Sequence, residues 1–143
     1  MKTKAVILIF VGLLVAMTAG SIYLALTTER AQKSVVSVPA PDGKYKAVRL
    51  RVAGDKPEPF CVDTIAVYLS VYPDSFAASE RNYEVYGGAC PAKDKRDALP
   101  KIEWTDNNSL RITYAVGDQG KPPRLKDKDA SLFVDITWVK AED

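Results

Sequence analysis

The chain has 143 residues, with 20 Lys and Arg, 18 Asp and Glu, and no histidine, which corresponds in length to about one domain. Lys2 and Lys4 account for the excess of positive charge and precede the first apolar segment, so the rest of the chain is neutral. This neutral remainder argues against a nucleic-acid-binding protein, which normally has a basic face. The absence of histidine removes the commonest general base and metal ligand.

Residues Ala5–Leu26 form an uncharged, mainly aliphatic segment of 22 residues. As a helix this segment would be ~33 Å long, enough to cross a hydrocarbon layer of ~30 Å. Lys2 and Lys4 on its N-terminal flank predict that this flank stays in the cytoplasm and that the bulk of the chain is exported. A cleaved signal peptide is the alternative, because small residues occupy positions 18–21, but residues 22–26 then resume the apolar segment.

We therefore expect three parts along the chain. Residues 1–26 form an anchor in the inner (cytoplasmic) membrane, or the alternative signal peptide, and residues 27–40 form a polar tether. Residues 41–143 form one exported domain, in the periplasm or outside the cell, since about a hundred residues support one small core.

The exported part shows the period-two alternation of apolar and polar residues that is typical of strands. The first of these segments places Val48, Leu50 and Val52 on one face and Arg49 and Arg51 on the other. Residues 74–81 are the only segment of this part with a predicted helical turn or two. We expect strands over residues 44–52, 61–72, 82–86, 101–105, 110–114 and 132–139.

The predicted fold class is mainly β: an N-terminal transmembrane helix followed by a small antiparallel β-sandwich or β-sheet domain of about six strands. Trp104 and Trp138 are expected to be buried, each on the aliphatic face of its strand. In the last strand that face also contains Leu132, Val134 and Ile136.

Cys61 and Cys90 are the two cysteines of the chain, and both fall in the exported part. Outside the cytoplasm a lone pair of cysteines usually forms a disulfide bond, which in a loop of this size would stabilise the domain by roughly 3–4 kcal/mol. A redox or metal-binding pair is the alternative, but the two residues lack C-x-x-C spacing and the chain has no histidine to join them.

Three motifs carry a resemblance to a known pattern. They are Pro41-Asp42-Gly43-Lys44-Tyr45-Lys46, Cys61 followed by Thr64, and Ile102-x-Trp104-x-Asp106-Asn107-x-x-Leu110-x-Ile112-x-Tyr114. This pattern resembles a family of small uncharacterised bacterial membrane-anchored proteins with one β-rich exported domain. The resemblance implies a fold and a location but no activity. The chain departs from it at residues 62–65, which replace a Gly-Ala-Thr-Thr run, and in a longer segment over 117–130.

No arrangement of residues for catalysis stands out. A serine enzyme without histidine would need a lysine base, and no S-x-x-K arrangement is present. Asp127, Asp129 and Ser131 have the spacing that begins a calcium loop, but Trp138 stands where the bidentate Glu belongs. We therefore predict no enzyme activity, no metal and no cofactor.

Two basic segments are candidate binding surfaces. The first is the loop from Gly117 to Asp129, which contains two adjacent prolines and the basic residues Lys121, Arg124 and Lys126. The second is the face of the first predicted strand that contains Arg49 and Arg51. A polar connection and a solvated strand face are the structural alternatives for these two segments.

These observations favour a protein-binding module that is anchored in the membrane through Ala5–Leu26 and acts without catalysis. Its partner would be another protein: a toxin, if the module is an immunity or inhibitor protein, or a subunit of a membrane or envelope complex, if the module is an accessory structural subunit. A histidine-free hydrolase is the remaining alternative. We predict no nucleic-acid partner.

Overall fold

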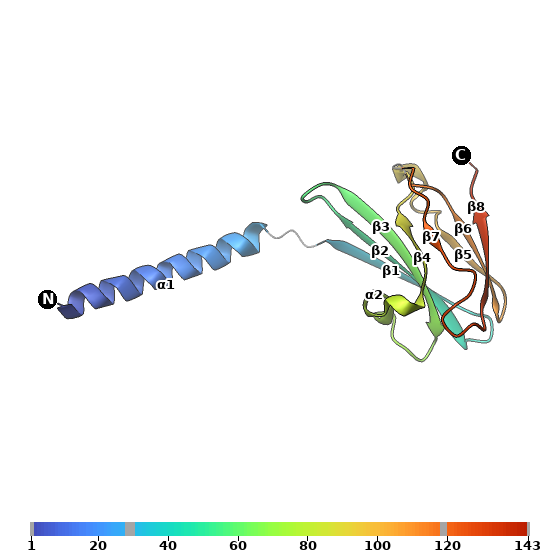
Figure 1. Ribbon diagram of the computed structural model, residues 1–143, viewed down its shortest axis with the longest axis horizontal. Helices are drawn as coiled ribbons and strands as arrows, with labels where there is room; N and C mark the ends of the chain where they lie inside the picture. The colour runs from blue at the N-terminus through green and yellow to red at the C-terminus, as the bar shows by residue number, and fades with distance from the viewer. Residues whose placement is uncertain (1, 28–30, 118–119, 143) are drawn as a thin grey trace. The chain divides into compact units, whose positions relative to one another are not determined.

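The computed structural model describes residues 2–27, 31–117 and 120–142. Residues 28–30 of the predicted tether and 118–119 of the predicted basic loop therefore lie outside the described residues. Helix α1 (Lys2–Thr27) contains the predicted anchor, as Figure 1 shows. Its segment Val6–Tyr23 has a mean hydropathy of 2.3 and is long and apolar enough to span a membrane.

The described residues from Ala31 onward form eight strands and three short helices. The helices are α2 (Phe76–Ser79), η1 (Arg81–Tyr83) and η2 (Lys93–Lys95). The strands are β1 (Gln32–Pro39), β2 (Tyr45–Gly54), β3 (Phe60–Leu69), β4 (Glu84–Ala89), β5 (Lys101–Asp106), β6 (Ser109–Tyr114), β7 (Arg124–Leu125) and β8 (Asp135–Lys140).

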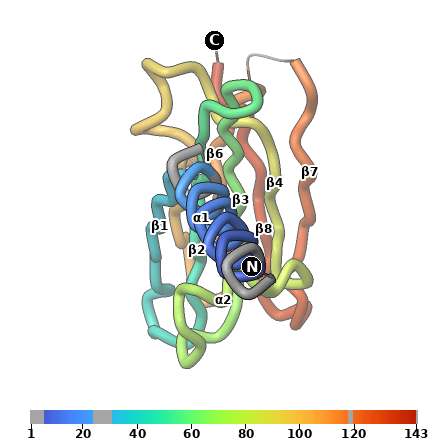
Figure 2. Tube along the Cα trace, turned by 90° about the vertical axis from the view of Figure 1, so that its left-hand side faces the viewer, coloured from blue at the N-terminus to red at the C-terminus, as the bar shows by residue number. Residues whose placement is uncertain are grey.

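The strands form two open sheets. The larger sheet is antiparallel with the order β1-β2-β3-β4-β7, which can be followed from one edge to the other in Figure 2. The smaller sheet has the order β5-β6-β8, and its β6 and β8 are parallel. The predicted fold class, an apolar helix followed by a mainly antiparallel β domain, is confirmed. The parallel pair was not predicted, and it arises because the chain crosses to β7 in the other sheet before it returns as β8.

The main core lies between the two sheets, because both contribute side chains to one apolar cluster. The larger sheet contributes Tyr45, Ala47, Ile65, Val67, Val85 and Tyr86. The smaller sheet contributes Leu110 and Ile112 from β6 and Ile136 from β8, and Val134 directly precedes β8. Trp104 and Trp138 pack against this cluster on the predicted faces but are only partly buried, so the prediction that they are buried is confirmed in part.

A second, smaller cluster lies on the other face of the larger sheet. Val48, Ala66 and Tyr68 are buried there beneath the segment that contains α2 and η1. The ring of Tyr68 meets the rings of Phe76 and Tyr83 edge-on, at centroid distances of 5.4 and 6.0 Å. These contacts cover one end of this face and explain why both faces of β3 are apolar.

The predicted tether over 27–40 is wrong for most of its length, because Gln32–Pro39 forms β1 and pairs with β2 along its whole length. The side chains of this strand are nearly all exposed, since it lies at the edge of the larger sheet. An exposed edge strand has no buried face to impose an apolar alternation, so its sequence resembles a polar linker.

The last predicted strand also begins later than expected, at Asp135 rather than Leu132. Val134 and Ile136 are buried as predicted, but the side chain of Leu132 is 68% exposed. The chain turns at Leu132, which has a φ of 65°, and this turn ends the predicted alternation.

Tyr86 provides a test of the core. Burial, followed by the nearby carboxylate of Asp63, raises the pKa of Tyr86 to about 12. The pKa of tyrosine in an unfolded chain is about 10, so the folded protein favours the protonated hydroxyl of Tyr86. The stabilisation of the fold that results is complete below pH 10. It should decline by about 1.4 kcal/mol per pH unit as the pH rises toward 12. We expect alkaline unfolding curves of the wild type to show this decline, and those of Tyr86→Phe to show a smaller one, because burial also raises the pKa of Tyr68.

Candidate functional site

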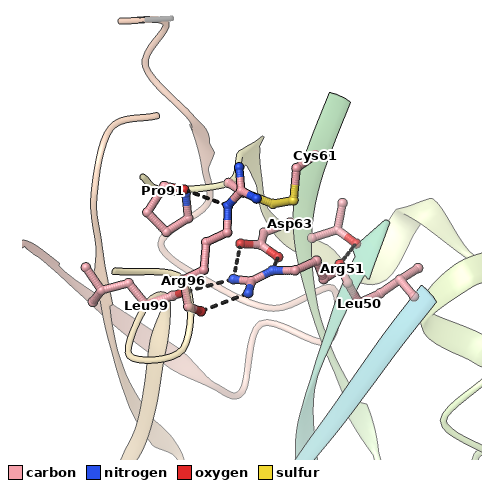
Figure 3. The surroundings of a disulfide bond; sticks show 9 residues. Leu50, Arg51, Cys61, Asp63, Pro91, Arg96 and Leu99 are labelled. Carbon is pink, nitrogen blue, oxygen red and sulfur yellow. Dashed lines mark hydrogen bonds and ion pairs between the residues drawn. A yellow bond between two sulfur atoms is a disulfide. The ribbon is translucent and has the colours of Figure 1, made fainter. Parts of the chain in front are cut away.

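The register of β2 and β3 pairs Arg51 with Asp63 on the face that points toward the smaller sheet. The guanidinium donates to both oxygens of the fully buried Asp63 carboxylate, at 2.7 and 2.8 Å. It also donates to the backbone carbonyls of Arg96 and Leu99, at 2.8 and 2.9 Å, as Figure 3 shows. All these partners belong to the same chain, so this guanidinium is used within the fold.

Arg49 is used in a similar way, since its guanidinium donates to the carbonyl of Pro100 at 3.2 Å. Burial lowers the pKa of Arg49, whereas the hydrogen bond to Asp63 raises the pKa of Arg51. Both side chains hold residues 90–100, which connect the larger sheet to the smaller one. The predicted basic face of the first strand therefore points into the domain and clamps this connection.

The disulfide between Cys61 and Cys90 is confirmed. Cys61 lies in β3 and Cys90 directly follows β4, and the amide of Cys90 donates to the carbonyl of Cys61 at 3.0 Å. The bond fixes the start of the same connection that Arg49 and Arg51 hold, and Figure 3 shows it beside Arg51 and Asp63.

The predicted basic loop contains a short strand that forms an edge of the larger sheet. Leu125 and Arg124 of β7 pair with β4, and the amide of Lys126 donates to the carbonyl of Val85 at 2.9 Å. Two glycines of β4 face this segment, and Gly88 lets Pro123 approach closely. A Cβ at Gly87 would lie 2.8 Å from the Arg124 guanidinium, and one at Gly88 would lie 2.8 Å from the Cβ of Pro123.

This pairing produces a hollow of about 120 Å³ at the sheet edge. We call it the basic groove, and its lining residues are Arg81, Glu84, Val85, Arg124 and Lys126. The Arg124 guanidinium lies 2.7 Å from the Glu84 carboxylate. Within the described part of the chain neither Arg81 nor Lys126 has an ion-pair partner, so the groove has three cations for one carboxylate.

The structure thus brings together two of the three basic residues predicted in the loop. Arg124 and Lys126 line the groove, whereas Lys121 is exposed and lies outside it. Arg81 was missed by sequence reasoning, because it comes from η1, more than forty residues earlier in the chain. Only the pairing of β7 with β4 places it beside the other two.

Comparisons of this chain with protein-family models, with curated proteins and with solved structures find no match. The resemblance to small bacterial membrane-anchored proteins therefore stays a prediction, and the function has to be inferred from the chemistry of the groove.

Proposed function

We propose that this protein is an envelope-anchored, non-catalytic module that binds another protein through the basic groove. The observation that carries the proposal is the convergence of Arg81, Arg124 and Lys126 around a single carboxylate. Two cations in excess, exposed at the rim of a hollow, favour a partner that presents carboxylates there. The proposed location is the outer side of the inner membrane, with α1 as a single-pass anchor oriented by Lys2 and Lys4.

The partner classes follow from this location. A soluble toxin with an acidic surface would make the protein an immunity or inhibitor protein. A set of membrane proteins would make it an accessory structural subunit of an envelope complex. Both classes would use the same electrostatic contact, so the test begins with the groove and then identifies the partner.

The test compares two charge-reversal variants of the full chain, purified from membranes of its host through a C-terminal tag. Arg81→Glu/Lys126→Glu reverses the two groove cations that have no ion-pair partner among the described residues. We expect recovery of the partner to fall about tenfold or more, because like charges would then face each other across the contact. Recovery with the wild type should also fall as the salt concentration rises past about 0.15 M.

Lys121→Glu is the matched control, because it makes the same kind of charge change at an exposed position outside the groove. It should leave recovery of the partner unchanged. Retention of a stoichiometric partner by the double reversal would exclude the groove as the contact. Failure of the wild type to retain any partner would contradict the proposed function itself.

A further inference from the structure

The connection between β7 and β8 presents two large apolar side chains to solvent. Leu132 is 68% exposed and Phe133 is 67% exposed, although the next residue, Val134, is completely buried. In a small domain, two adjacent exposed side chains of this size form an apolar protrusion that folding alone does not require.

The backbone beneath these side chains is held firmly. The carboxylate of Asp129, which is only 2% exposed, accepts hydrogen bonds from the amides of Val134 at 2.9 Å and Ser131 at 3.1 Å, and from the Ser131 hydroxyl. The side-chain amide of Asn108, in the turn between β5 and β6, donates to the carbonyl of Phe133 at 3.0 Å. The connection between β7 and β8, from here on the loop, is thus preorganised. Binding through it would therefore require little ordering of the backbone.

Leu132 also adopts an unfavourable backbone conformation, since its φ of 65° lies in the left-handed region. There the Cβ of any residue other than glycine crowds its own backbone, and leucine has no side-chain hydrogen bond to compensate. Because the Leu132 side chain is mostly exposed, packing inside the domain does not offset this cost. Strain of this kind is typical of residues that serve a contact with another molecule.

The loop lies at the end of the larger sheet opposite to the start of β1. The hydroxyl of Ser131 is 3.4 Å from that of Tyr45, at the start of β2, so the loop adjoins the turn that follows β1 (Figure 1). Since β1 has eight residues, this turn is about 26 Å from Gln32, where the domain begins. The loop therefore lies at the end of the larger sheet that is remote from Gln32.

The charges around the loop favour a protein over an anionic lipid surface as the occupant. Lys128 and Asp135 form an ion pair of 2.6 Å beside it, the turn after β1 contains Asp42 and Lys44, and Asp106 ends β5. These cations do not outnumber the carboxylates, whereas binding to anionic membranes requires an excess of cations. Leu132 lies six residues after Lys126 of the basic groove, so the two are at most about 22 Å apart along the chain, a span that one partner can cover.

We propose that Leu132 and Phe133 form an apolar anchor that inserts into a hydrophobic pocket of a protein partner. Carboxylates on the rim of that pocket would meet the basic groove. This inference rests on the proposed function and adds to it the part of the contact that does not depend on charge.

The first test places a photoreactive benzoylphenylalanine at position 133 of the full chain, in membranes of its host. The matched control places it at position 71, where Val71 is 82% exposed in the turn after β3. The expected result is one adduct with a different protein at position 133 and none at position 71, with the cross-linked partner peptide lining an apolar pocket. An adduct with lipid, or with a second copy of this chain, would overturn the inference.

The second test is Leu132→Gly, which relieves the strain and removes the anchor together. The melting temperature should rise by about 2–4 °C. Recovery of the partner should nevertheless fall about tenfold, as for the loss of a central apolar contact. Phe133→Ser should reduce recovery equally without the rise, and Val71→Ser should change neither quantity.

The two proposals can fail separately. Normal recovery with Leu132→Gly and Phe133→Ser, together with loss of the partner in Arg81→Glu/Lys126→Glu, would overturn the apolar anchor and leave the basic groove as the contact. No adduct at position 133 and no partner with the wild type would overturn both proposals.

Discussion

Replacing Asp63 by alanine is expected to lower the free energy of unfolding by about 3–5 kcal/mol, the usual loss when one member of a buried ion pair is removed. The Asp63 side chain is completely buried and that of Arg51 is only 16% exposed. Without the carboxylate, the charged guanidinium would stay in the interior with only the carbonyls of Arg96 and Leu99 as acceptors. The measurement is equilibrium unfolding of the full chain in detergent.

The matched control is Glu103→Ala, which breaks the ion pair of 2.8 Å with Lys101 at the surface. This pair is about half exposed and screened by solvent, so its loss should lower the free energy of unfolding far less than the loss of the buried pair. The double replacement Arg51→Met/Asp63→Leu removes both buried charges and should restore most of the stability lost in Asp63→Ala. Equal stability of Asp63→Ala and Glu103→Ala would show that the pair does not hold the connection between the sheets.

The side chains that share one face of a strand were predictable from the sequence. Which part of the domain packs against that face was not. Alternation correctly separated Val48 and Leu50 from Arg49 and Arg51. It did not show that the face with the arginines points toward the smaller sheet, because that sheet is built from residues after position 100. The alternation within one strand separates its two faces. It does not tell which face a sheet formed by later residues will cover. The arginines therefore resembled an exposed binding surface, although they act inside the domain.

The basic groove was predictable only in part, because one of its cations comes from a distant segment of the chain. The basic character of the segment that contains Arg124 and Lys126 is visible in the sequence, and a long connection in a compact domain is often functional. The contribution of Arg81 depends on the pairing of β7 with β4, which is only two residues long and leaves no periodic signal. The Leu132–Phe133 anchor was hidden because both residues continue the apolar pattern of the final strand.

Replacing both Cys61 and Cys90 by serine is expected to lower the free energy of unfolding by about 3–4 kcal/mol. The bridge closes a loop with a sequence separation of 29, and a loop of that size gives this value in the chain-entropy treatment. Denaturant unfolding of the full chain measures the loss, and wild-type protein that has been reduced and alkylated should show the same loss. A variant as stable as the wild type would show that the bridge contributes nothing to the fold.

The disulfide and the ion pair should not contribute independently. Cys61 and Asp63 are two residues apart on the same face of β3, and Cys90 begins the connection that Arg51 holds. Once either constraint is lost, the connection gains freedom and the other constraint has less ordered structure left to stabilise. We therefore expect the triple replacement Cys61→Ser/Cys90→Ser/Asp63→Ala to lose about 1 kcal/mol less than the sum of the separate losses. Additivity within about 0.3–0.5 kcal/mol would instead mean that the disulfide acts only on the unfolded chain.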